Sequence, residues 1–469
     1  MFKPSAFLAP LAAALMSLQI GPFSDSPPPD RGENWMILSR SFQGEKGLDF
    51  LGWSVASPGD LNKDGVAEII VGMPLAGRGA QAMVGKVIVY SGKDGGALFT
   101  LEGAGPRYEF GFSVSKMGDF DKDGVSDFLV GAPGASPAGL AQAGSVFIYS
   151  GKTGEVLRRF DGEQPLDAFG IDVIGGFDFN ADGYPDIVIG SPYADPFPFE
   201  IPPHNGVPSP NPVGRSAAGS VFIFSGKDGG LLLRLNGQSP HDHFGRMMEV
   251  VGDITGDGVP ELAVSAPTAS PGGRVKAGQV FIFSGKDGTP IRFFEGQEAG
   301  DRFGLSLARV MDINGDLISD LLIGAPDITH DGLTAAGSVF LYSGKNGDLL
   351  RRWDGHEVGE QLGRSIVSLG DLDGDGLADV IIGAPGSTTK LGKDGGSVSA
   401  FSGKDGRLLF RIDGADRIGK FGQVLAQVED DNGVGLGLLI GSPNVGDGVK
   451  MAVGRVQLYL RGSGAVTPH

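Results

Sequence analysis

Cysteine is absent from this 469-residue chain, and tryptophan occurs only three times, as Trp35, Trp53 and Trp353. The lack of cysteine excludes disulfide bonds and a lipid-modified cysteine. The scarcity of tryptophan argues against sugar binding that relies on aromatic platforms. Basic residues are also outnumbered, with 38 Lys and Arg against 56 Asp and Glu and a formal net charge of -18. We therefore expect no nucleic-acid partner.

Long apolar runs are missing except near the N-terminus. There Met1-Phe2-Lys3 precedes a largely apolar stretch from Ala6 to Ile20, which is too short to span a bilayer and has the pattern of a secretory signal. A buried N-terminal helix is the alternative. We expect a signal peptide over residues 1–21, a Pro-rich linker over 22–34 and a flexible tail over 463–469. The predicted location is secreted or extracytoplasmic, in a periplasm or at a cell surface, with no membrane span in the mature chain.

Glycine is abundant, with 81 residues, and most of it recurs at fixed positions. An acidic loop followed by a short apolar segment occurs seven times along the chain. Successive loops lie 59 residues apart, except that 75 residues separate Asp178 from Asp253. A fixed period of this length indicates a solenoid, an array or a propeller. The loops begin at Asp60, Asp119, Asp178, Asp253, Asp312, Asp371 and, in a degenerate copy, near Glu429 or Asp430.

Each repeat contains four segments with strand character. The first follows a Phe-Gly pair such as Phe110-Gly111, and the second is a continuous apolar run such as 128–130, which is typical of a strand covered on both faces. The third alternates, and an Asp-Gly turn such as Asp94-Gly95 leads from it into the fourth. Four antiparallel strands repeated seven times predict an all-β, seven-bladed propeller over residues 35–462. A linear array would instead leave unpaired edges on every sheet.

Three motifs recur in register: Phe-Gly, the acidic loop, and Gly-Ala-Pro, as in Gly131-Ala132-Pro133, Gly324-Ala325-Pro326 and Gly383-Ala384-Pro385. This pattern resembles the FG-GAP repeats of the integrin alpha-subunit N-terminal propeller. The resemblance implies a seven-bladed propeller with calcium in blade loops and a role in extracellular recognition or cell adhesion. Integrin propellers carry such loops only in the later blades, whereas the first six repeats qualify here. The resemblance therefore does not extend to integrin-style pairing and signalling.

The acidic loops have the spacing of a nine-residue calcium site. Oxygen ligands at positions 1, 3, 5 and 9 of a tight loop converge on one point, and calcium takes about six to eight of them. Position 6 is usually glycine because the chain reverses there with positive φ. We expect up to six structural Ca2+ ions, one in each of loops 1 to 6. The predicted ligands are Asp60, Asn62, Asp64 and Glu68 in loop 1; Asp119, Asp121, Asp123 and Asp127 in loop 2; Asp178, Asn180, Asp182 and Asp186 in loop 3; Asp253, Thr255, Asp257 and Glu261 in loop 4; Asp312, Asn314, Asp316 and Asp320 in loop 5; and Asp371, Asp373, Asp375 and Asp379 in loop 6.

Three copies depart from the ideal pattern. Loop 4 replaces one carboxylate with the weaker hydroxyl ligand Thr255, so we expect a lower affinity there. In loop 5, Leu317 stands at position 6, at a strain cost of about 1–2 kcal/mol. The seventh copy, from Glu429 to Val434, is one residue short, and we expect no ion in it.

The last repeat supplies only three strands, the third of them over residues 455–460. At the other end of the chain, residues 35–42 precede the first repeat and match the fourth strands of other repeats, such as residues 349–355. We therefore predict that this N-terminal strand pairs with residues 455–460 and completes the seventh blade. One such pairing satisfies both exposed edges and closes the ring without a disulfide.

One insertion interrupts the strict period, between Pro192 and Gly219, and it contains Phe197, Phe199 and His204. We predict a partner-binding site at these three residues, on the face opposite the acidic loops; a neutral surface insertion is the alternative. The nearby sequence 241–243, His-Asp-His, has the composition of a transition-metal site. Because other repeats carry an acid at its central position, we interpret that acid as part of the scaffold.

These patterns favour a secreted, calcium-stabilised propeller that acts as a binding or adhesion scaffold for extracellular protein or matrix. A carbohydrate-binding propeller lectin is the alternative, and a calcium-containing propeller enzyme acting on polysaccharide is a third interpretation. The chain has no serine nucleophile elbow, no HExxH motif and no carboxylate pair outside the loops. We therefore expect no enzymatic activity and no catalytic residues.

Overall fold

The computed structural model describes residues 36–77, 79–195, 217–429, 435–446 and 448–461. Within these ranges the secondary structure is β-strand, apart from the 3-10 turns η1 (Gly79–Gln81), η2 (Pro137–Gly139) and η3 (Pro271–Gly273). The expected all-β class is confirmed. No helix in this part of the chain is long and apolar enough to cross a membrane.

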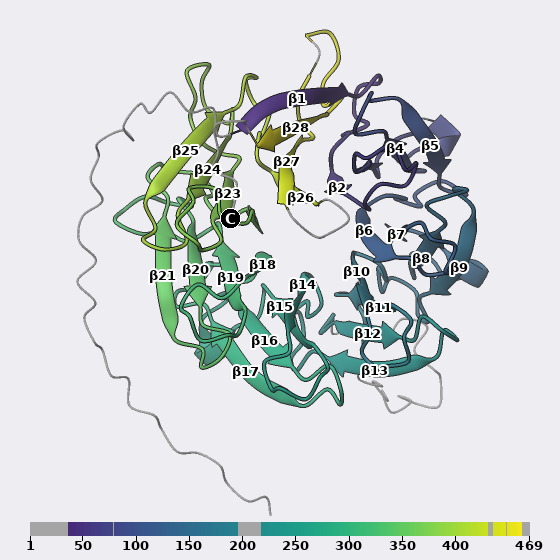
Figure 1. Ribbon diagram of the computed structural model, residues 1–469, viewed down its shortest axis with the longest axis horizontal. Helices are drawn as coiled ribbons and strands as arrows, with labels where there is room; N and C mark the ends of the chain where they lie inside the picture. The colour runs from purple at the N-terminus through teal and green to yellow at the C-terminus, as the bar shows by residue number, and fades with distance from the viewer. Residues whose placement is uncertain (1–35, 78, 196–216, 430–434, 447, 462–469) are drawn as a thin grey trace, which may run out of the picture. The chain divides into compact units, whose positions relative to one another are not determined.

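The strands form seven four-stranded antiparallel sheets, the blades of a propeller, within one compact unit that spans Gly32–His469 (Figure 1). In blades 1 to 6 the strands run in chain order from the axis outward, and the innermost strands of neighbouring blades contact one another around the ring. The predicted seven-bladed propeller is therefore confirmed.

Blade 1 contains β2 (Ser54–Ala56), β3 (Ile69–Met73), β4 (Lys86–Tyr90) and β5 (Ala97–Glu102), and blade 2 contains β6 (Ser113–Gly118), β7 (Asp127–Ala132), β8 (Ser145–Tyr149) and β9 (Val156–Asp161). Blade 3 contains β10 (Asp172–Phe177), β11 (Asp186–Ser191), β12 (Ser220–Phe224) and β13 (Leu231–Asn236), and blade 4 contains β14 (Met248–Gly252), β15 (Glu261–Ala266), β16 (Gln279–Phe283) and β17 (Pro290–Glu295). Blade 5 contains β18 (Ser306–Val310), β19 (Asp320–Ala325), β20 (Ser338–Tyr342) and β21 (Leu349–Asp354), and blade 6 contains β22 (Ser365–Ser368), β23 (Val380–Ala384), β24 (Ser397–Phe401) and β25 (Leu408–Asp413).

Blade 7 is assembled from both ends of the chain. Its inner strands are β26 (Val424–Glu429), β27 (Gly435–Ser442) and β28 (Arg455–Arg461), and its outermost strand is β1 (Met36–Gln43). In Figure 1 the purple β1 lies alongside the yellow β28, and the two strands run antiparallel. The predicted closure by the N-terminal strand is confirmed, although Trp35, which we expected in it, lies outside the described residues.

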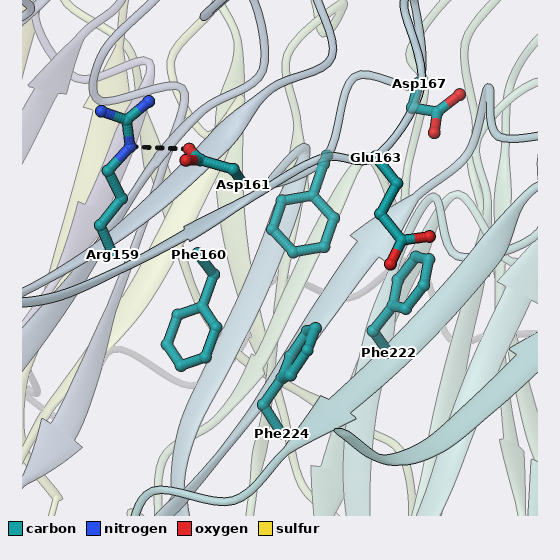
Figure 2. Close-up of a pocket in the computed structure, with 8 residues that line it drawn as sticks. Arg159, Phe160, Asp161, Glu163, Asp167, Phe222 and Phe224 are labelled. Atoms are coloured by element: carbon teal, nitrogen blue, oxygen red, sulfur yellow. Dashed lines mark hydrogen bonds and ion pairs between the residues drawn. The ribbon is translucent and has the colours of Figure 1, made fainter. Parts of the chain in front are cut away.

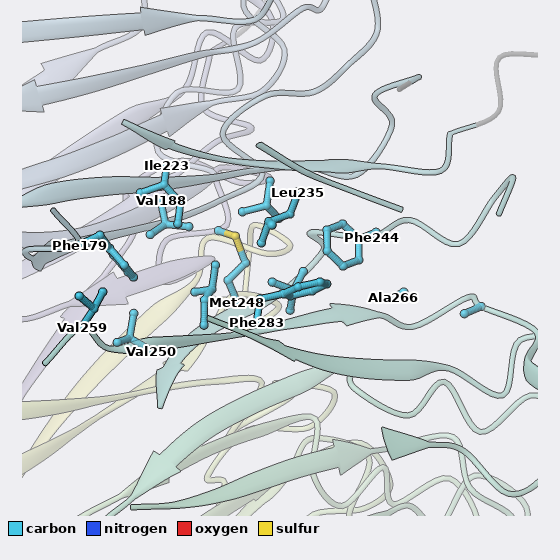
Figure 3. Close-up of a cluster of buried hydrophobic side chains, with 14 residues drawn as sticks. Phe179, Val188, Ile223, Leu235, Phe244, Met248, Val250, Val259, Ala266 and Phe283 are labelled. Carbon is cyan, nitrogen blue, oxygen red and sulfur yellow. The ribbon is translucent and has the colours of Figure 1, made fainter. Parts of the chain in front are cut away.

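The hydrophobic core lies between blades. Figure 3 shows one such seam, where Phe179 and Ile223 of blade 3 pack with Phe244 and Val250 of blade 4. The second strand of each blade is covered on both faces, and β7, β11, β15 and β19 are buried at every position. This double coverage explains why these segments are continuous apolar runs in the sequence.

The glycines of the Phe-Gly and Gly-Ala-Pro motifs meet between neighbouring blades. A Cβ on Gly131, at the end of β7, would lie 2.2 Å from the carbonyl oxygen of Gly170 in blade 3. Gly170 itself has a φ of +91°, and its own Cβ would lie 2.7 Å from Val146 Cγ2. Ser113 Oγ donates a hydrogen bond of 2.9 Å to the same Gly170 carbonyl. Only glycine permits this approach. The glycine of Gly-Ala-Pro in one blade and the glycine of Phe-Gly in the next therefore form a single contact between blades.

Arginines on outer strands bind the hairpin turn of the next blade around the ring. The guanidinium of Arg158, on β9, donates to the carbonyl oxygen of Gly226 at 2.8 Å, and Arg292 of blade 4 donates to Gly344 at the same distance. Arg40, on β1, donates in this way to Gly92 of blade 1 at 3.0 Å. The N-terminal strand therefore takes the place of a fourth strand in this contact as well as in the sheet.

Candidate metal centres on one face of the propeller

All six acidic loops connect the innermost strand of a blade to the second strand. The hairpin turn between the third and fourth strands lies beside them, because Gly151 of such a turn donates its N–H to Asp127 of loop 2 at 2.9 Å. Gly226, Gly344 and Gly403 make the equivalent bond in blades 3, 5 and 6. The loops therefore share one face of the ring with these turns.

Backbone N–H groups hold the acidic side chains of each loop in place. In loop 6 the two carboxylate oxygens of Asp371, at position 1, accept from the N–H groups of Asp375 at 3.1 Å and Gly376 at 2.8 Å. The carboxylate of Asp375, at position 5, accepts from Leu377 N–H at 3.0 Å. Loops 1 to 5 repeat this pattern. These hydrogen bonds fix the orientation of the acidic side chains in each loop.

Two residues in each loop adopt the left-handed backbone conformation. Position 6 has positive φ in all six loops, including Leu317 of loop 5, whose φ is 71° and whose side chain is 91% exposed. This confirms the backbone reversal expected at position 6 and places the strain in loop 5. Position 4 also has positive φ, from Lys63 at 61° in loop 1 to Gly374 at 80° in loop 6. The sequence does not reveal this second reversal, because Lys and Ala occupy position 4 in some loops and Gly in others.

Position 9 is a fully buried carboxylate at the start of the second strand. Burial raises the pKa of Glu68 in loop 1 to about 7, and the nearby Asp60 and Asp64 add repulsion. Burial likewise raises the pKa of Asp379 in loop 6 to about 7. Glu68 Oε1 is buried without a hydrogen-bond partner, whereas in the four aspartate copies the corresponding oxygen accepts from a turn glycine. An orphaned carboxylate oxygen among other carboxylates fits a site for a divalent cation.

The acidic side chains converge in four of the six loops. Three carboxylate oxygens lie within 4.8 Å of one another in loop 1 (Asp60, Asp64, Glu68), loop 2 (Asp119, Asp121, Asp127), loop 4 (Asp253, Asp257, Glu261) and loop 6 (Asp371, Asp373, Asp379). Among the described residues of loops 3 and 5, no three acidic side chains come this close.

The residues at positions 3 and 9 separate the two groups of loops, because each converged loop has an Asp at position 3 or the longer Glu at position 9, whereas loops 3 and 5 have Asn and Asp there. In loop 3 the second oxygen of Asp182 accepts from Asn180 Nδ2 at 3.1 Å, and in loop 5 that of Asp316 accepts from Ser343 Oγ at 3.1 Å. In loop 6, Asp375 is bound in the same way by a serine, but the position-3 carboxylate of Asp373 completes the cluster. Loops 3 and 5 have asparagine at position 3 and therefore lack this substitute.

Basic residues of the hairpin turns reach the loops, a contact that the sequence analysis missed. Lys93 Nζ donates to the carbonyl oxygen of Asp64 at 3.0 Å, and Lys345 Nζ donates to that of Asp316 at 3.2 Å. In loop 6, Arg407 Nη2 lies 2.6 Å from Asp373 Oδ2. A lysine in register after each Ser-Gly pair was the signal that could have revealed these contacts.

The other sequence-predicted residues do not belong to the acidic loops. Phe197, Phe199 and His204, predicted to bind a partner, lie outside the described residues. Asp242 is buried and accepts a hydrogen bond from Ser239 N–H at 3.1 Å, as expected for a scaffold acid. His243 Nδ1 lies 2.8 Å from Thr268 Oγ1 and joins no cluster of metal-ligating side chains in the described part of the chain.

A pocket of about 230 Å³ lies between blades 2 and 3 (Figure 2). Phe160, Phe169 and Phe222 line it, and Asp161 at its edge pairs with Arg159 at 2.6 Å. The rings belong to the buried core, with Phe160 8%, Phe169 2% and Phe222 6% exposed, so they offer no free platform for stacking on a sugar. Trp353, with 1% exposure, is equally inaccessible.

Comparison with known proteins supports the repeat assignment. The family model described as FG-GAP repeat matches residues 110–149, 169–224, 249–283 and 363–401. Integrin alpha-V of Gallus gallus is 34% identical over 223 residues, which cover 46% of this chain and 20% of the integrin.

A second group of relatives matches over more of the chain. Phosphatidylinositol-glycan-specific phospholipase D of Homo sapiens is 27% identical, over 89% of this chain and 54% of the relative, and that of Bos taurus is 28% identical, over 76% and 46%. The chain thus spans about half the length of these relatives. Their name is that of an enzyme, so the expectation that this chain has no enzymatic activity, which was based on the lack of a catalytic cluster, is wrong.

A solved structure of BBS1N in complex with ARL6DN matches 92% of this chain and 98% of the matched chain with a TM-score of 0.54 at 9% sequence identity. This likeness shows the propeller fold alone. The chain thus carries FG-GAP repeats in four matched segments, and its seven four-stranded blades form a propeller that resembles the N-terminal β-propeller of integrin alpha subunits.

Proposed function

We propose that the protein is a calcium-stabilised, extracytoplasmic propeller that serves as a binding scaffold for a protein, matrix or glycan ligand. The observation that carries this proposal is the repeated convergence of carboxylates in loops 1, 2, 4 and 6. Their oxygens are hard ligands held by backbone hydrogen bonds, which suits Ca2+ better than a transition metal. The integrin relatives support a recognition role and an extracellular location.

The donor sets favour structural calcium. The residues that would hold the ions are those at positions 1, 3, 5 and 9, with a backbone carbonyl from position 7. Each ion would neutralise a buried carboxylate and tie the innermost strand of a blade to the second strand. With the loops repeated around one face, calcium would stabilise the ring as a whole and leave the opposite face for ligands.

A pull-down from extracellular or matrix fractions, with and without chelation, tests this function. Calcium-dependent capture of a ligand, together with a melting temperature that falls in excess chelator, is the expected result. A melting curve that chelation leaves unchanged would show that calcium does not stabilise the propeller. A glycan array in calcium separates a glycan ligand from a protein ligand.

The phospholipase D relatives favour a second candidate function, because they match over 76% to 89% of the chain. The chain would then itself act on phosphatidylinositol glycans. Release of a phosphatidylinositol-glycan-anchored protein from membranes by the purified chain supports this candidate. Retention of the anchored protein, under conditions in which a known phospholipase D of this type releases it, argues against it.

A further inference from the structure

Three arginines of the neighbouring blades 4, 5 and 6 lie where the chain enters the innermost strands, near one end of the ring axis, and repel one another. Arg246 and Arg364 directly follow the glycines that precede the innermost strands β14 and β22, and Arg302 directly precedes Phe303 in blade 5. β14, β18 and β22 are neighbours around the ring. The acidic loops follow the far ends of these strands, so this axial arginine cluster lies on the face opposite the metal loops.

Backbone contacts fix the positions of the cluster. Arg302 has a φ of 50°, and its N–H donates to the carbonyl oxygen of Lys276 in blade 4 at 3.1 Å. Ser306 Oγ of blade 5 donates to the carbonyl oxygen of Gly363, next to Arg364, at 2.7 Å. The three arginines therefore extend from segments that are hydrogen-bonded across the seams between blades.

The fold does not require arginine at these positions. The residue that follows the Phe-Gly-type glycine is Arg246 in blade 4 and Arg364 in blade 6. In the other blades it is Trp53, Phe112, Ile171, Leu305 and Gln423. Apolar and uncharged side chains serve equally well there, so the two arginines need an explanation other than packing.

The positive charge of the cluster is poorly balanced. Arg302 Nε forms an ion pair with Asp327 Oδ2. The side chain of Arg246 donates only to Met247 Sδ, at 3.7 Å, and no carboxylate among the described residues forms a hydrogen bond or ion pair with Arg246 or Arg364. Both are half-buried, and burial together with repulsion from Arg246 and Arg302 lowers the pKa of Arg364 to about 10. The Arg364 guanidinium is therefore still charged at neutral pH.

One further carboxylate lies near the cluster without neutralising it. Asp172, on β10, attracts Arg246, but its Oδ2 is already engaged by the N–H of Met248 at 2.8 Å. Three cations thus face two carboxylates, of which one is engaged elsewhere. No nitrogen of Arg246 or Arg364 is both buried and without a partner, so their forked N–H donors are accessible, and an oxyanion would satisfy them.

We propose that the axial arginine cluster binds an oxyanion, namely the phosphate or carboxylate group of a ligand. This inference rests on the proposed function, because it names the chemistry of a ligand that the scaffold would recognise. Arg246 and Arg364 are the primary contacts, since their donors are free of carboxylates. Arg302 remains tied to Asp327 and adds longer-range attraction.

Isothermal titration of the full chain in calcium tests the proposal, with glycerol 3-phosphate as the phosphate probe and lactate as the carboxylate probe. We expect the wild type to bind at least one probe, with an affinity that falls as salt is raised. Arg364→Gln and Arg246→Gln should each weaken binding at least tenfold. Arg411→Gln is the matched control, because Arg411 is an exposed arginine on β25 that pairs with Asp413 at 2.8 Å.

The proposal is overturned if the wild type binds neither probe. It is also overturned if the wild type and both cluster variants bind a probe equally well. If a variant fails to fold, modification of arginines by phenylglyoxal in the wild type decides the question. Glycerol 3-phosphate or lactate should protect Arg246 and Arg364, and a lack of protection also overturns the proposal. If calcium raises the melting temperature but no oxyanion binds, only this inference fails. If an oxyanion binds but calcium does not raise the melting temperature, only the proposed function fails.

Discussion

Phe42 of the first strand lies opposite Val456 of the last strand, and both side chains are buried. The Phe42 ring also packs against Tyr90 of blade 1, with ring centroids 4.4 Å apart. One aromatic residue near the start of the propeller therefore contacts the final strand and the first blade together. The two ends of the chain are joined by strand pairing and burial, in a protein with no cysteine to cross-link them.

Deletion of residues 1–49 should abolish cooperative unfolding or cause aggregation, because it removes β1 and exposes the edge of β28. Deletion of residues 1–30 should leave the thermal transition unchanged, because β1 begins at Met36. Thermal unfolding followed by circular dichroism, together with light scattering, measures both effects. A cooperative, monomeric 1–49 deletion would show that blade 7 does not need β1.

Much of this architecture could be predicted from the sequence, because the pattern of strands, turns and motif glycines recurs seven times along the chain. The closing strand was predictable because residues 349–355 provide a fourth strand with which to compare residues 36–42. The contact between Gly131 and Gly170 was not, since both glycines are visible in the sequence but the approach of two backbones is not. Charged residues at and near the innermost strands differ from blade to blade, so the repeat pattern did not predict that they lie close together in the fold.

Asp371→Ala should destabilise the calcium-loaded protein more than Asp430→Ala. Asp371 belongs to a converged cluster, whereas Asp430 belongs to the degenerate seventh copy and lies outside the described residues. An ion present at 100 times its dissociation constant contributes about 2.7 kcal/mol per site. Urea unfolding in calcium measures the difference, and repetition in excess chelator should remove most of it. Equal destabilisation by both substitutions in calcium would contradict a bound ion in loop 6.

The metal loops show where sequence reasoning fails at the level of single sites. All six loops match the ligand pattern, yet loops 3 and 5 do not bring three carboxylates together. These two loops combine Asn at position 3 with the shorter Asp at position 9, whereas each converged loop has an Asp at position 3 or a Glu at position 9. The ligand spacing alone does not show how far each side chain reaches toward the common centre, so it predicted all six loops alike.

Glu249→Gln should be more stable than the wild type at pH 8, and this advantage should be smaller at pH 5. Glu249 lies on the innermost strand β14, where burial raises its pKa from 4.5 to about 7, Asp172 adds repulsion and Arg309 opposes the shift. A raised carboxyl pKa means that the folded state favours the protonated form. Its stabilising contribution is complete below about pH 4 and is lost as the pH rises through 7.

The glutamine variant stays neutral, so its advantage at pH 8 should reach about 1–3 kcal/mol. Chemical unfolding at the two pH values measures this advantage. Glu102→Gln is the control, since Glu102 is exposed and pairs with Lys86 at 3.3 Å, and its effect should stay within about 0.5 kcal/mol at both pH values. An equal effect of Glu249→Gln at pH 5 and pH 8 would show that the negative charge of Glu249 does not destabilise the folded protein.

Trp353→Ala should destabilise the propeller by about 3–5 kcal/mol, because it leaves a large cavity between blades 5 and 6. Trp353 is 1% exposed on the outer strand β21, and its Nε1–H donates to the carbonyl oxygen of Gly406 in blade 6 at 3.2 Å. Trp353→Phe retains most of the packing but leaves that carbonyl without its donor, so it should cost less, about 1–2 kcal/mol. Phe293→Ala, on the outer strand of blade 4, is the control, because Phe293 is 60% exposed and its loss should have little effect. Urea unfolding in calcium measures the loss of stability in each of the three variants. If Trp353→Ala costs no more than Phe293→Ala, the outer seam between blades 5 and 6 contributes little to stability.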